Sequence, residues 1–184
     1  MDTLCVHASF RPTRPSQSVG AMVAHLSPEL VTCWLTGTSG TCTSIFKPVF
    51  LDGAGLPEVG PRPDSADDGA SLWWAHEGLH RAVIGDHATR MPLYQAERDA
   101  LEAQFLREAA ELSATYRQVS AEDRAAPLAA STASCFARAS EATATWRDRV
   151  QAAPVTHRPG RRRGGSHPPL VSGHQHAPVP GGGG

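Results

Sequence analysis

The sequence lacks several features that mark whole classes of protein. It contains no run of about 18 apolar residues, so we expect no membrane-spanning helix. The first 25 residues contain no apolar stretch of about 7 to 15 residues, which predicts no secretory signal peptide. Lys plus Arg number 17 and Asp plus Glu number 18, so no cationic excess is present and we expect no general nucleic-acid binding.

Cysteine is also sparse. The four cysteines are separated by 28, 9 and 93 residues, at Cys5, Cys33, Cys42 and Cys135. These separations fit neither a zinc ribbon nor a dense disulfide framework. We therefore expect a reduced, cytoplasmic setting.

What is present divides into four regions by composition. Hydrophobic residues make up 40% of the 184 residues, which is enough for the core of one domain. Residues 1–51 hold the β-prone material, and residues 52–70 are a linker rich in Gly, Pro and Asp. Residues 71–150 have helical periodicity. Residues 151–184 are rich in Gly, Pro, His and Arg, which predicts a disordered tail.

A β-hairpin is predicted at residues 17–36. Side chains alternate with period two over residues 17–26 and again over residues 30–36, on either side of a Ser-Pro-Glu turn. The same kind of pattern resumes within residues 44–51 and predicts a third strand there.

We expect this hairpin to be covered on both faces. Counting along each strand assigns Met22 and Trp34 to one face, and Val23 and Leu35 to the other. Both faces would then carry apolar side chains, and such strands usually lie inside a sheet with cover on both sides.

Three helices are predicted after the linker. Apolar stripes mark a first helix over residues 72–84 and a long second helix over residues 92–119, with Pro92 in its first turn. A third helix is expected to follow a capping box at residues 120–123 and to end near Val150. The charged faces of the long helix are expected to be solvated.

The first helix contains a literal H-E-x-x-H sequence. Two imidazoles at i and i+4 can share a zinc ion, here from His76 and His80, and the glutamate Glu77 would then act as general base. However, Gly78 weakens the helix, and the extended form of the motif is absent because Val83 and Asp86 stand at its Gly and third His positions. The competing hypothesis is a packed structural helix.

Five short segments share their order and spacing with a known family. They are Leu4–Ala8, Arg14–Val23, Thr36–Thr38, Ser44–Pro48 and Trp73–Arg81. Together these segments resemble the secernin and cysteine-dipeptidase family, over about residues 1–150. The resemblance makes the H-E-x-x-H an incidental part of a structural helix.

The resemblance implies an N-terminal-nucleophile hydrolase, which stacks two sheets between layers of helices. In such an enzyme a cysteine exposed at the mature N-terminus attacks an amide, and its own α-amino group acts as the base. The matching segments belong to the family's C-terminal part, and Cys5 corresponds to an internal position, so no catalytic residue is assigned to this chain. We expect a partial α+β sandwich of this type that needs no cofactor, contributes to the hydrolysis of dipeptides and is inactive alone.

The partners follow from the same expectation. Ser16, Gln17 and Ser18 begin the matched hairpin and are predicted to line a pocket for a small peptide substrate, provided that the missing N-terminal part completes the fold. Strands with open edges and no second sheet invite association, so a homo-oligomer is a further expectation.

Two other functions stay open at this point. One is a zinc peptidase that uses His76, His80 and Glu77. The other is a non-catalytic interaction module, in which the helices of residues 92–150 pair with a partner.

Overall fold

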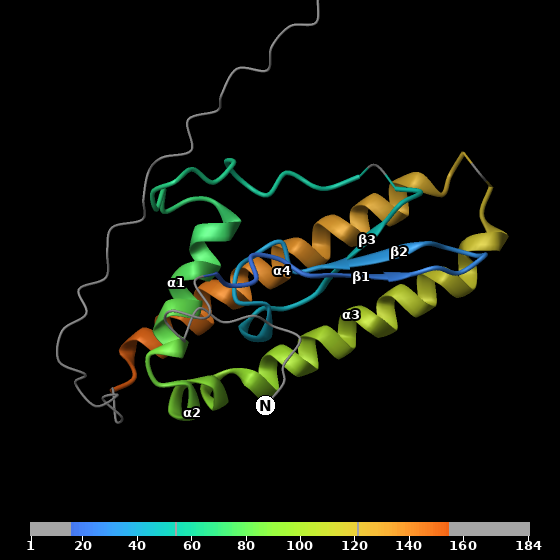
Figure 1. The fold of residues 1–184 in the computed structure, drawn as a ribbon. Coiled ribbons are helices and arrows are strands. Elements are labelled where there is room, and N and C mark those ends of the chain that lie inside the picture. Colours follow the sequence, from blue (N-terminus) through green and yellow to red (C-terminus); the bar gives the residue numbers. More distant parts are fainter. Residues whose placement is uncertain (1–15, 54, 121, 155–184) are drawn as a thin grey trace, which may run out of the picture.

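The protein has an α+β fold in the computed structural model, which describes residues 16–53, 55–120 and 122–154 (Figure 1). Three antiparallel strands form one sheet in the order β1 (Met22–His25), β2 (Thr32–Leu35) and β3 (Lys47–Phe50). Four helices follow, α1 (Leu72–Ile84), α2 (His87–Arg90), α3 (Gln95–Thr115) and α4 (Ala125–Ala152). None of the described helices is long and apolar enough to cross a membrane.

The predicted hairpin and third strand are confirmed, but the assignment of faces is wrong. Met22 lies opposite Leu35, and Val23 lies opposite Trp34. Directly opposed residues share a face, so Val23 belongs with Trp34 and not with Leu35. Period two within each strand does not determine the register between two strands, because the length and shape of the turn set it.

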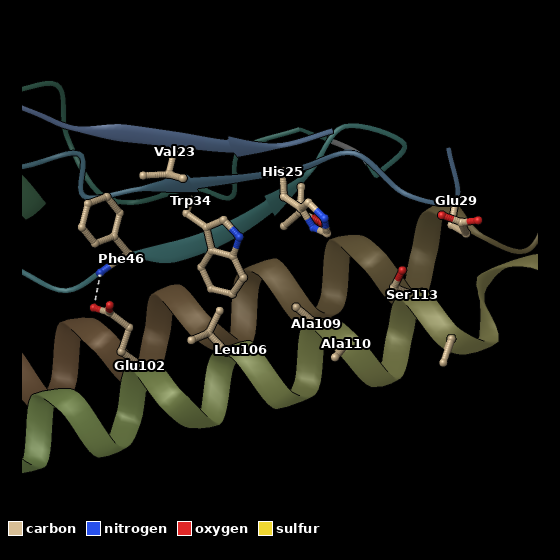
Figure 2. Close-up of a pocket in the computed structure, with 12 residues that line it drawn as sticks. Val23, His25, Glu29, Trp34, Phe46, Glu102, Leu106, Ala109, Ala110 and Ser113 are labelled. Atoms are coloured by element: carbon tan, nitrogen blue, oxygen red, sulfur yellow. Dashed lines mark hydrogen bonds between the residues drawn. The ribbon is translucent and has the colours of Figure 1, made fainter. Parts of the chain in front are cut away.

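Cover of the sheet is uneven. All four side chains of β3 are buried, whereas all four of β1 are exposed. Helix α4 packs along β3, and α3 lies under the face of the sheet that carries Val23 and Trp34 (Figures 1 and 2). The expectation that the hairpin is covered on both faces is therefore wrong for β1.

Helix α1 begins as its sequence suggests. The Ser71 side chain accepts a hydrogen bond from Trp74 N at 3.3 Å, which caps the first turn. The buried side of α1 packs against α4. The linker that precedes α1 has neither helix nor strand in its described residues, 52–53 and 55–70.

Helix α4 departs from the predicted start. Ser120 Oγ donates to Asp123 Oδ2 at 2.5 Å, but the helix starts at Ala125, with Arg124 as a cap that offers no side-chain bond. The two residues thus bond to each other rather than to the first turn of the helix. Helix α4 ends at Ala152, close to the predicted end near Val150, and the tail expected to be disordered lies, from residue 155 on, outside the described residues.

The hydrophobic core lies between the sheet and three of the helices. Tyr94 and Trp146 stack with ring centroids 5.1 Å apart and join α4 to the start of α3. Phe105 of α3, Leu79 of α1 and Phe50 of β3 are fully buried in the same cluster. The helices of residues 92–150 therefore share one core with the strands, which gives no support to a separate helical module.

Candidate functional site

A buried polar loop connects β2 to β3 and is held between α1 and α3. It spans residues 36–46 and includes a short 3-10 turn at Thr41–Thr43. Gly40 has a left-handed φ of 55°, and a Cβ atom there would lie 2.1 Å from His80 Nδ1. Both the conformation and the close approach to His80 therefore require glycine at this position.

His76 and His80 meet at one threonine hydroxyl of this loop. Thr43 Oγ1 lies 3.4 Å from His76 Nε2 and 3.1 Å from His80 Nδ1. The hydroxyl donates its single hydrogen to Gly40 O at 2.7 Å, so an imidazole that bonds to it must act as the donor. Burial, together with the neighbouring His80 and Lys47, lowers the pKa of His76 to about 3, so this ring is neutral at pH 7.

Glu77 bonds to a serine of the loop and to an arginine of α1. Its carboxylate accepts a short hydrogen bond from Ser39 Oγ and one from Arg81 Nε at 2.7 Å. The glutamate is buried, whereas the Arg81 side chain is 57% exposed, so the ion pair connects the interior to solvent. Glu77 is thus used in packing the loop against α1.

This arrangement does not supply the ligands of a catalytic zinc ion. No group of three His, Cys, Asp or Glu side chains that could hold a metal is found in the part of the chain that the structure describes. A catalytic zinc usually has three protein ligands and one open position. His87, which could have joined the same helix face, is exposed and starts α2 instead.

Lys47 is buried at the end of the same loop. Its Nζ donates to Thr36 O at 2.7 Å and to Ile45 O at 3.0 Å, and lies 5.4 Å from the centre of the Phe136 ring. Burial lowers the pKa of Lys47 to about 8, and the carboxylate of Glu102 acts in the opposite direction. The amine holds together the two ends of the loop.

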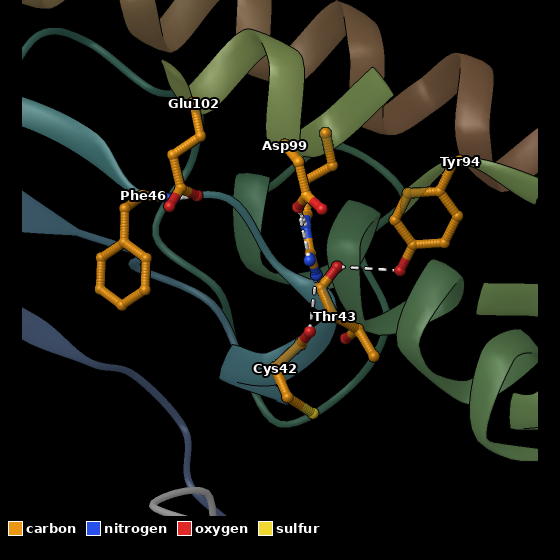
Figure 3. A network of polar contacts seen from close by, with 7 residues as sticks. Cys42, Thr43, Phe46, Tyr94, Asp99 and Glu102 are labelled. Carbon is orange, nitrogen blue, oxygen red and sulfur yellow. Dashed lines mark hydrogen bonds and ion pairs between the residues drawn. The ribbon is translucent and has the colours of Figure 1, made fainter. Parts of the chain in front are cut away.

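The other side of the loop is held by α3 and the residue before it (Figure 3). Tyr94 OH donates to Thr43 O at 2.9 Å, and Arg98 Nη1 donates to Cys42 O at 2.8 Å. Glu102 Oε2 accepts from Phe46 N at 3.1 Å. Residues 94, 98 and 102 are one helical turn apart and so share one face of the helix. Arg98 and Glu102 are therefore not simply solvated, as their helix face was expected to be.

An apolar groove runs between α3 and the sheet (Figure 2). We call it the α3 groove; its volume is about 860 Å³. Its apolar lining includes Val23, Trp34, Phe46 and Leu106. Glu102 lies toward the Phe46 end and Glu29 at the opposite end, and no Lys or Arg is among the described residues that line it. The groove has the size of a binding site for a small molecule or a short segment of chain.

The opposite face of the hairpin is also apolar. Alternation along the strands places Met22, Ala24, Cys33 and Leu35 on it, and we call this surface the outer face. Met22 and Ala24 are exposed, while Cys33 and Leu35 are half-buried. Apolar side chains on two paired strands thus remain accessible on the side of the sheet away from α3.

The predicted substrate residues lie at one end of this sheet. Ser16 is exposed, and Gln17 and Ser18 are half-buried. Ser18 O accepts from Gly40 N at 3.1 Å, which ties the entry of the hairpin to the polar loop. The three residues do not line the α3 groove. Cys5 lies outside the described residues.

Sequence reasoning missed the interactions of the polar loop. The spacing of four between Tyr94, Arg98 and Glu102 was a possible signal, but no pattern in the sequence connects it to residues 42–46. The alternation of β1 likewise could not reveal the groove, because its second wall comes from α3.

Comparison of the chain with family models, curated proteins and solved structures finds no match.

Proposed function

We propose that this chain is the C-terminal portion of a cysteine amidohydrolase of the N-terminal-nucleophile type, acting on small peptides such as dipeptides. The observation that supports the proposal best is the uneven cover of the sheet. Helix α3 lies under one face of the hairpin, while the outer face carries exposed Met22 and Ala24. The same face is covered at β3, where Lys47 and Val49 are buried, so it is bare only toward β1. A sheet that is covered on one face and only partly covered on the other resembles one half of a sandwich.

The second sheet of such a hydrolase would cover the outer face. The sequence resemblance places the family's nucleophile in the part that precedes these segments, so the polypeptide supplying the second sheet would also supply the cysteine. The α-amino group would take the thiol proton, and the thiolate would attack the carbonyl carbon of the peptide bond. The C–N bond would then break, with the proton passing to the departing amine, and water would hydrolyse the resulting thioester to free the cysteine. In this proposal the present chain contributes strands, the polar loop and the helices, and Ser16, Gln17 and Ser18 face the substrate.

The cysteines that the structure describes give no reason to place the nucleophile here. Cys135 is fully buried, and burial raises the pKa of its thiol, which disfavours the thiolate. Cys33 is half-buried in β2. Cys42 is exposed, and its carbonyl oxygen is bound by Arg98 within the polar loop.

Complementation tests the proposal. The purified chain would be mixed with a separately expressed N-terminal portion of a secernin-type dipeptidase that carries the nucleophilic cysteine. We expect dipeptide hydrolysis from the mixture and none from either part, with loss of activity after treatment by a thiol alkylator. Hydrolysis by this chain alone that survives a chelator would contradict the proposal, as would a stable complex without activity.

Matched variants identify the surface that is used. Met22→Asp places a charge on the outer face, at a position 65% exposed, and is expected to abolish complementation without unfolding the chain. Ile84→Asp changes a residue that is 50% exposed at the end of α1, and is expected to leave complementation unchanged. Equal effects of the two variants would argue against docking at the outer face.

A further inference from the structure

Strand β1 is the edge of the sheet in the part of the chain that the structure describes. Ala21 N donates to Thr36 Oγ1 at 2.9 Å, and Thr36 N donates to Ala21 O at 3.1 Å. Backbone groups of alternate strand residues point the same way, so those of Val23 point toward β2 as well. The N–H and C=O groups of Met22 and Ala24 therefore point away from β2, toward the open edge.

Apolar side chains surround this edge. Val19, Val23 and Leu26 are 64%, 57% and 77% exposed, and Leu106 on the facing helix is 53% exposed. The edge strand carries neither Lys nor Pro, the residues that commonly protect a sheet edge. The α3 groove and the unpaired edge thus form one continuous surface, which can take an extended segment with apolar side chains on one side.

The chain itself contains a segment of this kind. Fifteen residues precede the described part, and within them apolar residues alternate with Cys, His and Ser, as Leu4, Val6, Ala8 and Phe10. Strict alternation over seven residues is the signature of a strand with one apolar face. Eight residues, including Pro12 and Pro15, connect this segment to Val19 and are enough to reverse the chain direction.

We propose that residues 4–10 form an edge strand antiparallel to β1, with Leu4, Val6, Ala8 and Phe10 closing the α3 groove. Opposing Val6 to Val23 sets Phe10 against Val19 and leaves residues 11–18 as the connection. At about 3.3 Å per residue the segment spans about 23 Å, close to the length of the exposed edge over residues 19–26.

Charge agrees with this occupant. The carboxylate of Glu102 lies at the Phe46 end of the groove, where no described Lys or Arg lines it, whereas Glu29 at the other end is already paired with Arg117. The first 15 residues carry Arg11 and Arg14 against a single acidic side chain, Asp2. A second copy of β1, by contrast, would bring no positive charge to the groove.

The proposed strand changes the meaning of two residues singled out in the sequence. With the apolar side chains in the groove, alternation turns Cys5 and His7 to the outer face. Both would then extend the surface that we propose for the second sheet. The edge strand itself does not depend on that proposal, because it concerns only contacts within this chain.

Amide hydrogen exchange in the full chain, followed by NMR, tests the strand. Pairing would protect the amides of Met22 and Ala24, and we expect exchange at least about tenfold slower than in an unstructured chain. Val6→Asp, which puts a charge into the groove, is expected to remove this protection. His7→Asp is the matched control on the other face and is expected to retain it.

Two controls make the result decisive. The amide of Val49 in buried β3 reports whether each variant is still folded, and it should stay protected throughout. Fast exchange of Met22 and Ala24 in the unaltered chain would overturn the proposal. Protection that grows with protein concentration and survives Val6→Asp would also overturn it, because a second copy would then be the occupant.

Discussion

Strands β1 and β3 belong to the same sheet and have the same length, yet they lie in opposite environments. Every side chain of β3 is buried, including Lys47, and every side chain of β1 is exposed. Strand β3 has α4 packed along it, whereas no described element pairs with the outer edge of β1. The difference indicates that one side of this fold is complete and that the other needs further cover.

The β3 side of the fold, where the sheet is covered, is rich in buried polar groups. His76, His80, Glu77 and Lys47 are all buried there, and each bonds to the loop between β2 and β3 or to one of its ends. Buried polar groups are costly unless they are bonded, so this part must keep one arrangement. The β1 side consists of short, apolar strands, and we expect it to tolerate more substitutions.

The largest expected difference concerns core packing. Phe105 has no exposed surface, and Phe105→Ala should lower the free energy of unfolding by about 3–5 kcal/mol. Met22 is 65% exposed, and Met22→Ala should cost less than about 0.5 kcal/mol. Urea denaturation of the two variants measures both values. Similar losses would show that the β1 side is as fully packed as the core.

The free energy of unfolding should depend on pH because of the buried His76 on the β3 side of the fold. The pKa of His76 is lowered to about 3, from about 6.5 in the unfolded chain. Between these values the unfolded state binds a proton that the folded state does not, so the free energy of unfolding falls as the pH falls. Between pH 7 and pH 4 we expect a loss of up to about 3 kcal/mol from this residue.

Denaturation at the two pH values, compared between variants, measures this loss. His76→Asn should flatten the pH dependence, whatever it does to stability at pH 7. His87→Asn is the matched control, since His87 is exposed at the start of α2, and it should leave the pH dependence unchanged. A His76→Asn chain that loses stability with acid as steeply as the unaltered chain would contradict the expectation.

The smallest effect is expected at an exposed ion pair near the turn of the hairpin. Arg117 Nη2 lies 2.5 Å from Glu29 Oε1, and the Arg117 side chain is 65% exposed. Such pairs contribute little, so Arg117→Gln should lower the free energy of unfolding by less than about 1 kcal/mol, and by still less at high salt. Thermal unfolding at two salt concentrations measures it. A large loss that does not depend on salt would mean that Arg117 acts through packing.

Local patterns were sufficient to predict much of the fold. The alternation of residues 17–26 and 30–36 predicted the hairpin, and the stripes near Leu79 and Phe105 predicted helices with those residues inward. Each of these patterns has the period of its own element. The polar interactions depended on contacts between distant segments, so they left no such pattern.

The register of the hairpin and the start of α4 could not be predicted from local patterns. Pairing Val23 with Trp34 required the geometry of the turn, which period two does not contain. The Ser120 and Asp123 side chains looked like a cap, but they bond to each other before the helix begins. The polar loop was harder still, since Glu102 binds a backbone group 56 residues away.

The contacts of Tyr94, Arg98 and Glu102 with the loop set a limit on changes of chain length. Each residue added to an α-helix turns all later side chains by about 100°. One residue inserted between Arg98 and Glu102 would carry the carboxylate away from Phe46 N, while the Tyr94 contact stayed in place. Sequences that keep this fold can therefore exchange many surface residues of α3, but they must keep the number of residues between these three positions.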